Sequence, residues 1–560
     1  MFEKFYNFVF RAIQSPIKRN FMLFATLIAF ILSIIMIAPS NIVLAKMLPG
    51  KNNDTFTIYA TLPEGSSIQQ TNEVTDCIVE YAQKEQEVRD LEVFLGMGAP
   101  LDFAGLIKGS HFKNSENVAE IVLNLTKKHH REEPSYLMVQ RIRPVIQKSC
   151  ASIYKGTDIS FVEPPAGPPV LAAVVAEIYG DDSKGIRELS NRVADVFKNT
   201  KGLVDVEIMQ DTIYDTFEIQ VQSTKVALSG VNIKQLNDIL YLAFEGMQIA
   251  VKNSDLVDNQ IPIYLSLSPE SKKFSSKDIN AIKAKLSSLK LMNKLGMMIP
   301  ITELVKFSPK KSNPMITSKN LHQMTNVMAE TDMVSQVYPL MKARNVILNI
   351  FKDKYKIEKI GLFNLKLTDK NSANIYKLIW DGEMEVTLDT FVELGAAFIA
   401  ALVLIFLLMV IYYKSYTLSA IILLGSFLSI VGVIVGHYIM DLFTTDTFFL
   451  TATSLIGFIA LIGISSRNSL LLIDFTASLM RDNKMRKSEA IAFATATRAK
   501  PIFLTAAAII LASTLLAKDA VFGGLGVSLI FGTIAAVIVS LIIVPILLFK
   551  ADLQRHFNLD

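Results

Sequence analysis

LIGISSRNSLLLIDF, residues 461–475, places an arginine, Arg467, inside an apolar run that continues from Phe448 to Phe475. A run of about 20 apolar residues is long enough to cross the hydrocarbon core of a bilayer as a helix. A charge at that depth costs at least a few kcal/mol, so intramembrane charges usually face protein or water and serve a function. We therefore expect Arg467 to face away from lipid and to have a functional role.

The composition indicates a membrane protein with a large aqueous part. The chain has 560 residues, of which 51% are hydrophobic and 19% are charged. This is too apolar for an ordinary soluble protein of this size and too polar for a chain buried throughout in lipid. The net charge of +4 is small and dispersed, which argues against nucleic-acid binding. The sequence shows no cluster of metal ligands, no nucleophile–histidine–acid set and no phosphate loop. We therefore predict neither a cofactor nor an enzyme.

The two cysteines, Cys77 and Cys150, both lie in the polar part of the sequence. We expect two unpaired thiols. A disulfide is the alternative if this region is exported to an oxidising compartment.

Apolar runs predict six membrane spans. The first, residues 21–38, follows a basic amphipathic segment, residues 1–20. A signal peptide is the alternative here, but the basic segment is long and no clear cleavage site follows. The predicted later spans and tail are residues 394–413, 417–440, 448–475, 500–517, 524–549 and 550–560.

The charges between the spans predict their orientation. Lys414, the cluster from Arg481 to Lys500, and the tail residues Lys550 and Arg555 make alternate connections basic. The remaining connections are acidic or near neutral; they contain Asp441 with Asp446, and Lys518 with Asp519. Because basic loops stay in the cytoplasm, we expect both termini inside the cell and residues 46–389 outside it.

Residues 46–389 repeat β-α-β patterns, which predict an α+β domain made of several split βαβ, ferredoxin-like subdomains. The proline-rich stretch Glu163–Pro169 predicts a stiff boundary between two of them. The expected subdomains are residues 46–165, residues 170–215 together with 306–380, and an inserted subdomain at residues 218–305. The predicted fold class is thus a six-helix membrane protein with a large external α+β domain between the first and second spans.

Arg467 has two interpretations. It lies about 12 Å from the cytoplasmic end of its predicted helix, so it is either a snorkelling or structurally paired arginine, or the cation of a proton or ion relay. Asn468 is close enough to form hydrogen bonds. Asp474 lies about 10 Å further along the helix, too far for an ideal ion pair with Arg467. We interpret Asp474 as a helix-end residue.

The next span starts with Arg498-Ala-Lys-Pro501-Ile-Phe-Leu-Thr505. Pro501 is predicted near a helix N-terminus, where its missing N–H is harmless. Thr505 lies about one turn inside; a lone membrane threonine usually bonds its own helix, and a relay role is the alternative. In the last span, Gly526 and Gly532 favour close helix packing, although they are not spaced as a strict small-xxx-small pair.

These motifs together resemble those of the resistance–nodulation–division (RND) transporters. Gly463–Phe475 resembles the family pattern G-x-x-x-[KR]-N-[SA]-I-L-[LI]-[VI]-[DE]-F, and Arg498–Thr505 resembles R-x-R-P-I-x-[ML]-T. Gly526–Gly532, followed by Pro545, resembles the closing helix. The stretch Glu163–Pro169 looks like part of the porter region of the family's permeases. The resemblance covers nearly the whole chain.

The resemblance implies a proton-driven antiporter of the bacterial inner membrane. Family permeases typically work as trimers and pass substrate from a porter domain to a periplasmic adaptor and an outer-membrane channel. Arg467 takes the position of the relay cation, which is lysine in many members, and Thr505 takes that of the relay threonine. Residues 46–165 and the divided second subdomain then correspond to porter subdomains, and residues 218–305 to a docking subdomain.

The sequence departs from the family pattern in one respect: it has one set of six spans, with the motifs of the family's second half. The adjacent aspartates of the first half are absent from every predicted span. Arginine effectively never releases its proton, so Arg467 needs titrating carboxylates nearby for proton coupling. We therefore hypothesise a subunit of a split transporter whose companion chain supplies those aspartates.

Several alternatives stay open. They are a truncated half that does not transport, a homo-oligomeric half-transporter, and a membrane-anchored periplasmic binding or scaffold protein. The six-span component of the protein-export motor has a similar topology but a much smaller external domain. The substrate is expected to be hydrophobic or amphipathic, with metal ions as the other class. We interpret Met97, Met297 and Met298 as packing residues rather than as metal ligands.

Overall fold

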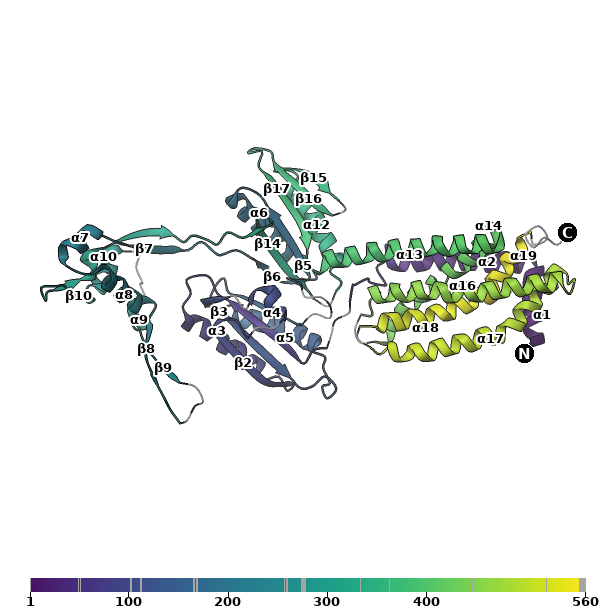
Figure 1. The fold of residues 1–560 in the computed structure, drawn as a ribbon, viewed down its shortest axis with the longest axis horizontal. Helices are drawn as coiled ribbons and strands as arrows, with labels where there is room; N and C mark the ends of the chain where they lie inside the picture. The colour runs from purple at the N-terminus through teal and green to yellow at the C-terminus, as the bar shows by residue number, and fades with distance from the viewer. Residues whose placement is uncertain are drawn as a thin grey trace. The chain divides into compact units, whose positions relative to one another are not determined.

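The computed structural model describes residues 2–48, 50, 52–100, 103–110, 113–164, 167, 170–255, 257, 260–272, 278–332, 334–361, 363–444, 447–519 and 521–552. It divides into two compact units (Figure 1): Met1–Gln210 with Ile316–Asp560, and Asp211–Met315. The first unit contains the apolar helices and two sheet-based subdomains. Asp446, Arg555 and four residues of the stretch Glu163–Pro169 lie outside the described residues.

Six helices of the described chain are long and apolar enough to cross a membrane, judged by length and composition. Four of them are single elements: α2 (Pro16–Ile37), α13 (Glu383–Tyr413), α16 (Ala452–Arg481) and α17 (Lys487–Leu516). The remaining two are composite: α14 (Tyr416–Phe427) with α15 (Ile430–Phe443), and α18 (Gly523–Ile538) with a π-helical turn (Val539–Ile543) and α19 (Val544–Lys550). In Figure 1, α16, α17 and α18 lie side by side.

Two sequence-based predictions about helix ends are wrong. Asp474 does not end its helix, because α16 continues to Arg481. Pro501 is not near a helix N-terminus either, since α17 begins at Lys487 and holds Pro501 in its interior. Apolar patterning marks only the apolar core of a helix and misses its polar turns. A proline inside a membrane helix is tolerated because neighbouring groups satisfy the freed backbone carbonyl.

The polar first turns of α17 pack against the N-terminal helix α1 (Phe2–Gln14). The Phe2 and Phe493 rings meet edge to face, with centroids 5.4 Å apart. Val9, Ala12 and Ile13 form the buried face of α1. A short break at Ser15, which caps α2, separates the two N-terminal helices.

The first subdomain is a four-stranded antiparallel sheet with the strand order β2-β3-β1-β4, covered by two long helices. Alternating apolar residues such as Phe56, Ile58 and Ile121 form its core with the helices. Its elements in chain order are β1 (Thr55–Thr61), α3 (Ile68–Ala82), β2 (Val88–Met97), α4 (Phe103–Lys108), β3 (Asn114–Leu125), α5 (Ser135–Cys150) and β4 (Asp158–Val162).

Cys77 on α3 and Cys150 on α5 form a disulfide, with their Cα atoms 5.7 Å apart. The expectation of two unpaired thiols is therefore wrong. The two helices pack against each other, which brings together cysteines that are 73 residues apart in the sequence. No local pattern in the sequence reports that contact.

The second subdomain is a seven-stranded sheet around a separate core that contains Phe197, Phe351 and Trp380. Its strands run in the order β13-β14-β5-β17-β16-β15, with β6 also paired to β14. Its elements are β5 (Val174–Tyr179), α6 (Ser183–Lys198), β6 (Leu203–Ile208), β13 (Ser318–Lys319), β14 (His322–Thr331), α12 (Val337–Phe351), β15 (Tyr355–Ile360), β16 (Asn364–Asp369) and β17 (Ile375–Asp381). Strand β17 leads directly into the membrane helix α13.

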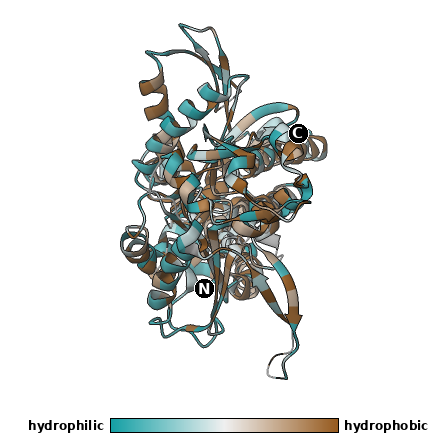
Figure 2. Ribbon diagram, turned by 90° about the vertical axis from the view of Figure 1, so that its left-hand side faces the viewer, coloured by the Kyte–Doolittle hydropathy of each residue, from teal (hydrophilic) through white to brown (hydrophobic). Residues whose placement is uncertain are grey.

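The second unit, Asp211–Met315, includes residues 218–305, the range that we predict for an inserted subdomain. Strand β7 (Asp215–Val221) enters it and β12 (Val305–Lys311) leaves it, and the two strands pair antiparallel. Between them lie α7 (Ser223–Ser229), α8 (Ile233–Phe244), β8 (Met247–Lys252), β9 (Ile261–Leu265), α9 (Pro269–Lys272), α10 (Ile279–Leu286), β10 (Lys290–Met292), β11 (Met298–Pro300) and α11 (Ile301–Leu304). Figure 2 shows hydrophobic residues along the fully exposed hairpin of β8 and β9.

The three methionines interpreted as packing residues are exposed instead. Met97 is 54% exposed, Met297 55% and Met298 57%. Met97 ends the edge strand β2, and Met297 and Met298 lie in the β10–β11 hairpin. The packing interpretation is therefore wrong.

Candidate functional site

Arg467 lies on the exposed face of α16. Exposed positions recur along this helix at Ile456, Ala460, Gly463, Arg467 and Leu471, a spacing of three or four residues that forms one stripe. A Cβ atom added at Gly463 would meet nothing within 4 Å among the described residues. We call these five residues the α16 stripe. It carries a cation between apolar and small side chains.

Within the part of the chain that the structure describes, Arg467 makes no hydrogen bond and no ion pair. The opposite face of α16 is packed and polar. Asn468 is buried there, and the Ser466 hydroxyl bonds that of Ser426 on α14 at 2.9 Å. The helix thus turns its small polar residues into the bundle and its one central charge out of it.

Asp474 is tied to α13 rather than to Arg467. It accepts hydrogen bonds from the hydroxyls of Tyr413 at 2.7 Å and Tyr412 at 3.4 Å. Because α13 continues directly from β17, this contact links α16 to the helix that leaves the second subdomain. Among the described residues, Asp474 and Arg467 do not form an ion pair with each other.

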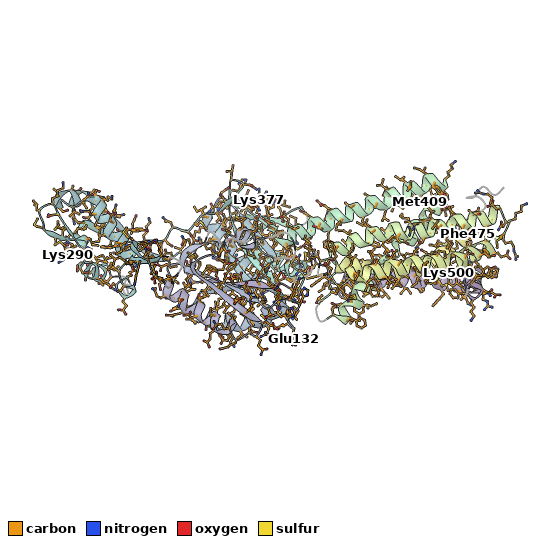
Figure 3. All side chains as sticks on the ribbon, turned by 60° about the horizontal axis from the view of Figure 1, so that its bottom comes forward. Glu132, Lys290, Lys377, Met409, Phe475 and Lys500 are labelled. Atoms are coloured by element: carbon orange, nitrogen blue, oxygen red, sulfur yellow. A yellow bond between two sulfur atoms is a disulfide. The ribbon has the colours of Figure 1, made fainter. Side chains whose placement is uncertain are left out.

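Thr505 is exposed on α17, and its hydroxyl donates to the carbonyl of Ile502 in its own helix at 3.0 Å. Among the described residues, no hydrogen bond joins Thr505 to Arg467, although α16 and α17 pack against each other. Figure 3 labels Phe475 and Lys500 in the same half of the bundle. There the Arg498 guanidinium lies 5.1 Å from the centroid of the Phe475 ring.

Gly526 and Gly532 lie where α18 meets its neighbours. A Cβ atom at Gly526 would run into the backbone of Ala517, and one at Gly532 would overlap the Leu461 side chain of α16. Gly532 therefore permits α18 to approach α16 closely, and Gly526 permits it to approach the C-terminal end of α17. Close approach is how membrane helices gain packing energy.

The structure also reveals a buried polar group that sequence reasoning did not single out. His437 on α15 is 0% exposed; its Nε2 lies 2.8 Å from the Ser454 hydroxyl and its Nδ1 2.8 Å from the Val433 carbonyl. Ser454 in turn contacts the Thr451 hydroxyl. The sequence did contain a signal for this group, a histidine inside an apolar span, because ionisable residues are rare within membranes.

The sequence model described as the AcrB/AcrD/AcrF family matches residues 3–552. Multidrug resistance protein MdtC of Erwinia tasmaniensis is 23% identical over 68% of this chain and 34% of its own length. The swarming motility protein SwrC of Bacillus subtilis is 24% identical, over 66% of this chain and 32% of its own. MdtC of Yersinia pseudotuberculosis is 21% identical, over 86% and 44%. The chain thus spans less than half the length of these relatives.

The crystal structure of a heavy metal efflux pump shares the fold, with a TM-score of 0.71 and 18% sequence identity. The match covers 99% of this chain and 52% of that chain. It confirms the expected fold at the level of apolar helices combined with a sheet-rich segment. With the six apolar helices, the family match indicates a multi-pass protein of the inner membrane. The chain belongs to the AcrB/AcrD/AcrF family of RND permeases.

Proposed function

We propose that this chain is one half of a proton-driven RND-type efflux transporter, and that a companion chain supplies the intramembrane carboxylates. One observation carries the proposal: Arg467 stands in the α16 stripe without a partner among the described residues. A cation that faced lipid at this position would be unfavourable by several kcal/mol. A second six-helix half packed on the stripe would enclose it.

The composition of the stripe suits such a contact. Ala460 and Gly463 lie within two turns of Arg467 and let a partner helix approach closely. Carboxylates on that helix would then pair with Arg467 when ionised and release it when protonated, since arginine itself keeps its charge. Proton uptake on the companion would thereby change the contact between the two halves. Thr505, exposed on the adjacent helix, would rotate its hydroxyl from Ile502 to a carboxylate in this cycle.

The topology supports the remaining assignments. Apart from the short helix α4 between β2 and β3, the first subdomain has the order β-α-β-β-α-β. This order and the strand order fit a split βαβ, ferredoxin-like unit. By the family pattern, residues 46–165 and the second subdomain would take up substrate, and the second unit would dock an adaptor and an outer-membrane channel in a trimer-like assembly. Both termini would lie in the cytoplasm, by the distribution of basic residues.

Substrates are proposed by class. The names of the relatives point to multidrug resistance for one and heavy metal efflux for another. We favour hydrophobic or amphipathic compounds, because the described residues contain no group of three histidine, cysteine, aspartate or glutamate side chains suited to a metal. A truncated half without transport, or a membrane-anchored periplasmic scaffold, is the alternative function.

Coexpression of this chain with a candidate companion half, followed by efflux of a fluorescent lipophilic dye from cells, tests the proposal. Arg467→Ala should reduce efflux at least about tenfold, because the loss of a buried ion pair exceeds 1.4 kcal/mol. Arg467→Lys should restore part of it, since the cation is retained. Arg481→Ala, at the end of the same helix, is the matched control. Full efflux with Arg467→Ala would rule out a relay role for Arg467. If the unsubstituted chain and all of its variants show no efflux, the scaffold function is favoured.

A further inference from the structure

The N-terminal helix α1 lies at the end of the helical bundle where α17 begins and α19 ends (Figure 1). Its residues Val9, Ala12 and Ile13 are buried, and Val9 and Ile13 share a core with Leu548 of α19. Much of the rest of α1 is exposed. An amphipathic helix beside a membrane span is suited to the boundary between lipid headgroups and acyl chains.

The exposed side of α1 carries two cations and a phenylalanine. Lys4, Phe8 and Arg11 are exposed and follow one another at spacings of four and three residues, so they lie on one face of the helix. We call these three residues the α1 face. Within the described part of the chain, neither Lys4 nor Arg11 makes a side-chain hydrogen bond or an ion pair, not even with Glu3, the one acidic residue of α1. The protein therefore leaves both charges of the α1 face without a described counter-charge.

A second pair of cations lies around the Phe549 ring of α19. The guanidinium carbon of Arg19, on α2, is 5.4 Å from the ring centroid, and Nζ of Lys487, on α17, is 5.3 Å from the same centroid. Among the described residues, both side chains donate only to backbone carbonyls. Arg19 Nη1 donates to Ile13 at 3.3 Å, and Lys487 Nζ donates to Ala551. The described residues supply no carboxylate in ion-pair contact with either cation.

This second pair has the chemistry of an anion site. Arg19 Nε is buried and has no hydrogen-bond partner among the described residues. A buried donor without a partner is unfavourable, so Arg19 gains stability by turning its guanidinium toward an acceptor. The planar guanidinium matches phosphate oxygens, and lysine binds phosphate as a point charge. An anion bound to both Arg19 and Lys487 would also offset the repulsion between the two cations.

The position of Arg19 along α2 favours a lipid as the source of the phosphate. Apolar side chains of α2 begin within one turn of Arg19, and several of them are exposed, including Phe21, Phe24 and Leu27. Acyl chains cover such side chains when a helix spans a bilayer. A phosphate held at Arg19 is therefore at the level along α2 where the headgroup of a lipid would lie.

We propose that the α1 face and the Arg19–Lys487 pair bind the headgroups of anionic phospholipids. The pair holds a lipid phosphate, and the α1 face lies against the negatively charged bilayer surface with Phe8 inserted among the headgroups. Basic residues near such a surface each raise the affinity about fivefold. The inference goes beyond the proposed transport function and depends neither on proton coupling nor on a companion half.

Native mass spectrometry of the full-length chain tests the proposal. The chain is released from detergent that contains equal amounts of phosphatidylglycerol and phosphatidylcholine, and it should retain phosphatidylglycerol in preference. Arg19→Gln combined with Lys487→Gln should lower this preference about tenfold or more, because two cations are lost. Lys4→Gln combined with Arg11→Gln should lower it by a smaller factor, since salt screens exposed charges. The second double variant changes only exposed side chains and provides the test if the first does not fold.

Two controls accompany these variants. Lys518→Gln removes an exposed cation beyond the far end of α17 and should leave the lipid preference unchanged. Arg19→Lys keeps the charge and should retain most of the preference. An unchanged preference in both double variants would overturn the proposal. Displacement of phosphatidylglycerol by an equal amount of inorganic phosphate would show a site for free anions and overturn the lipid assignment. A dimer that Lys4→Gln with Arg11→Gln dissociates would overturn it too, because a second copy would then cover the α1 face.

Discussion

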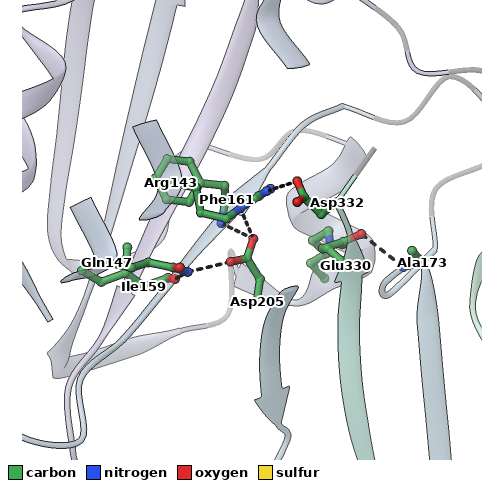
Figure 4. A network of polar contacts seen from close by, with 9 residues as sticks. Arg143, Gln147, Ile159, Phe161, Ala173, Asp205, Glu330 and Asp332 are labelled. Atoms are coloured by element: carbon green, nitrogen blue, oxygen red, sulfur yellow. Dashed lines mark hydrogen bonds and ion pairs between the residues drawn. The ribbon is translucent and has the colours of Figure 1, made fainter. Parts of the chain in front are cut away.

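Two arginines show opposite ways of placing a charge in this molecule. Arg143 lies between the two subdomains and pairs with Asp205 and Asp332 (Figure 4). Arg467 lies on the α16 stripe and has no partner among the residues that the structure describes. The first site is complete within the chain. The second has no partner among the described residues, and under the proposed function a companion half would supply one.

The largest expected effect is a difference between the two arginine sites in the free energy of unfolding. Asp205→Ala should lower the free energy of unfolding of the two sheet-based subdomains by about 3–5 kcal/mol, because it leaves Arg143 buried without its main partner. Arg467→Met should change the stability of the isolated chain by no more than about 0.5 kcal/mol, as for a surface position. Urea unfolding followed by the fluorescence of Trp380, the single tryptophan, reports the second subdomain directly. Equal changes in the free energy of unfolding for Asp205→Ala and Arg467→Met would contradict the distinction between the two sites.

The second prediction concerns how stability depends on pH near Arg143. Burial raises the pKa of Glu163, near Arg143, from 4.5 to about 7, with the Ser135 hydroxyl opposing the shift. The folded state therefore binds this proton more tightly than the unfolded state does, and stability should fall as pH rises from 4.5 to 7 and stay level above that.

Glu163→Gln should remove this slope and stabilise the sheet-based subdomains at pH 8 by up to about 3 kcal/mol, the equivalent of the shift in pKa. Urea unfolding at a series of pH values provides the measurement. Glu132→Gln, at an exposed position, is the control. A pH slope that persists in Glu163→Gln would show that another group carries it.

The smallest effect on stability is expected in the α16 stripe. Gly463→Leu should leave the unfolding of the isolated chain unchanged within about 0.5 kcal/mol, since the added side chain meets open space. It should nevertheless reduce copurification of the companion half, because a bulky residue blocks close helix approach. Ala400→Leu, exposed on α13, is the matched control. Copurification that survives Gly463→Leu would place the companion on another face.

Much of the membrane region was predictable because its signals are local. An apolar run and a charge within it are both recognised within one helix length. The orientation inferred from the basic connections stays a prediction. The ends of the helices were not predictable from the sequence. Asp474 and Pro501 lie in turns whose helical state depends on packing against α13 and other neighbours. The sheet-based subdomains have local strand and helix patterns in the sequence, but the contacts between their distant segments could not be predicted from it.

The sequence by itself predicted six apolar segments, repeated β-α-β units and the family motifs around Arg467, because each depends on residues close together in the chain. Only the tertiary structure decided that Cys77 bonds Cys150, that Asp205 pairs with Arg143, and that Arg467 faces outward. These depend on contacts between distant segments and on which face of a helix is covered. The apolar run around Arg467 predicted that its charge needs a partner, and the fold shows that none of the described residues of this chain supplies one.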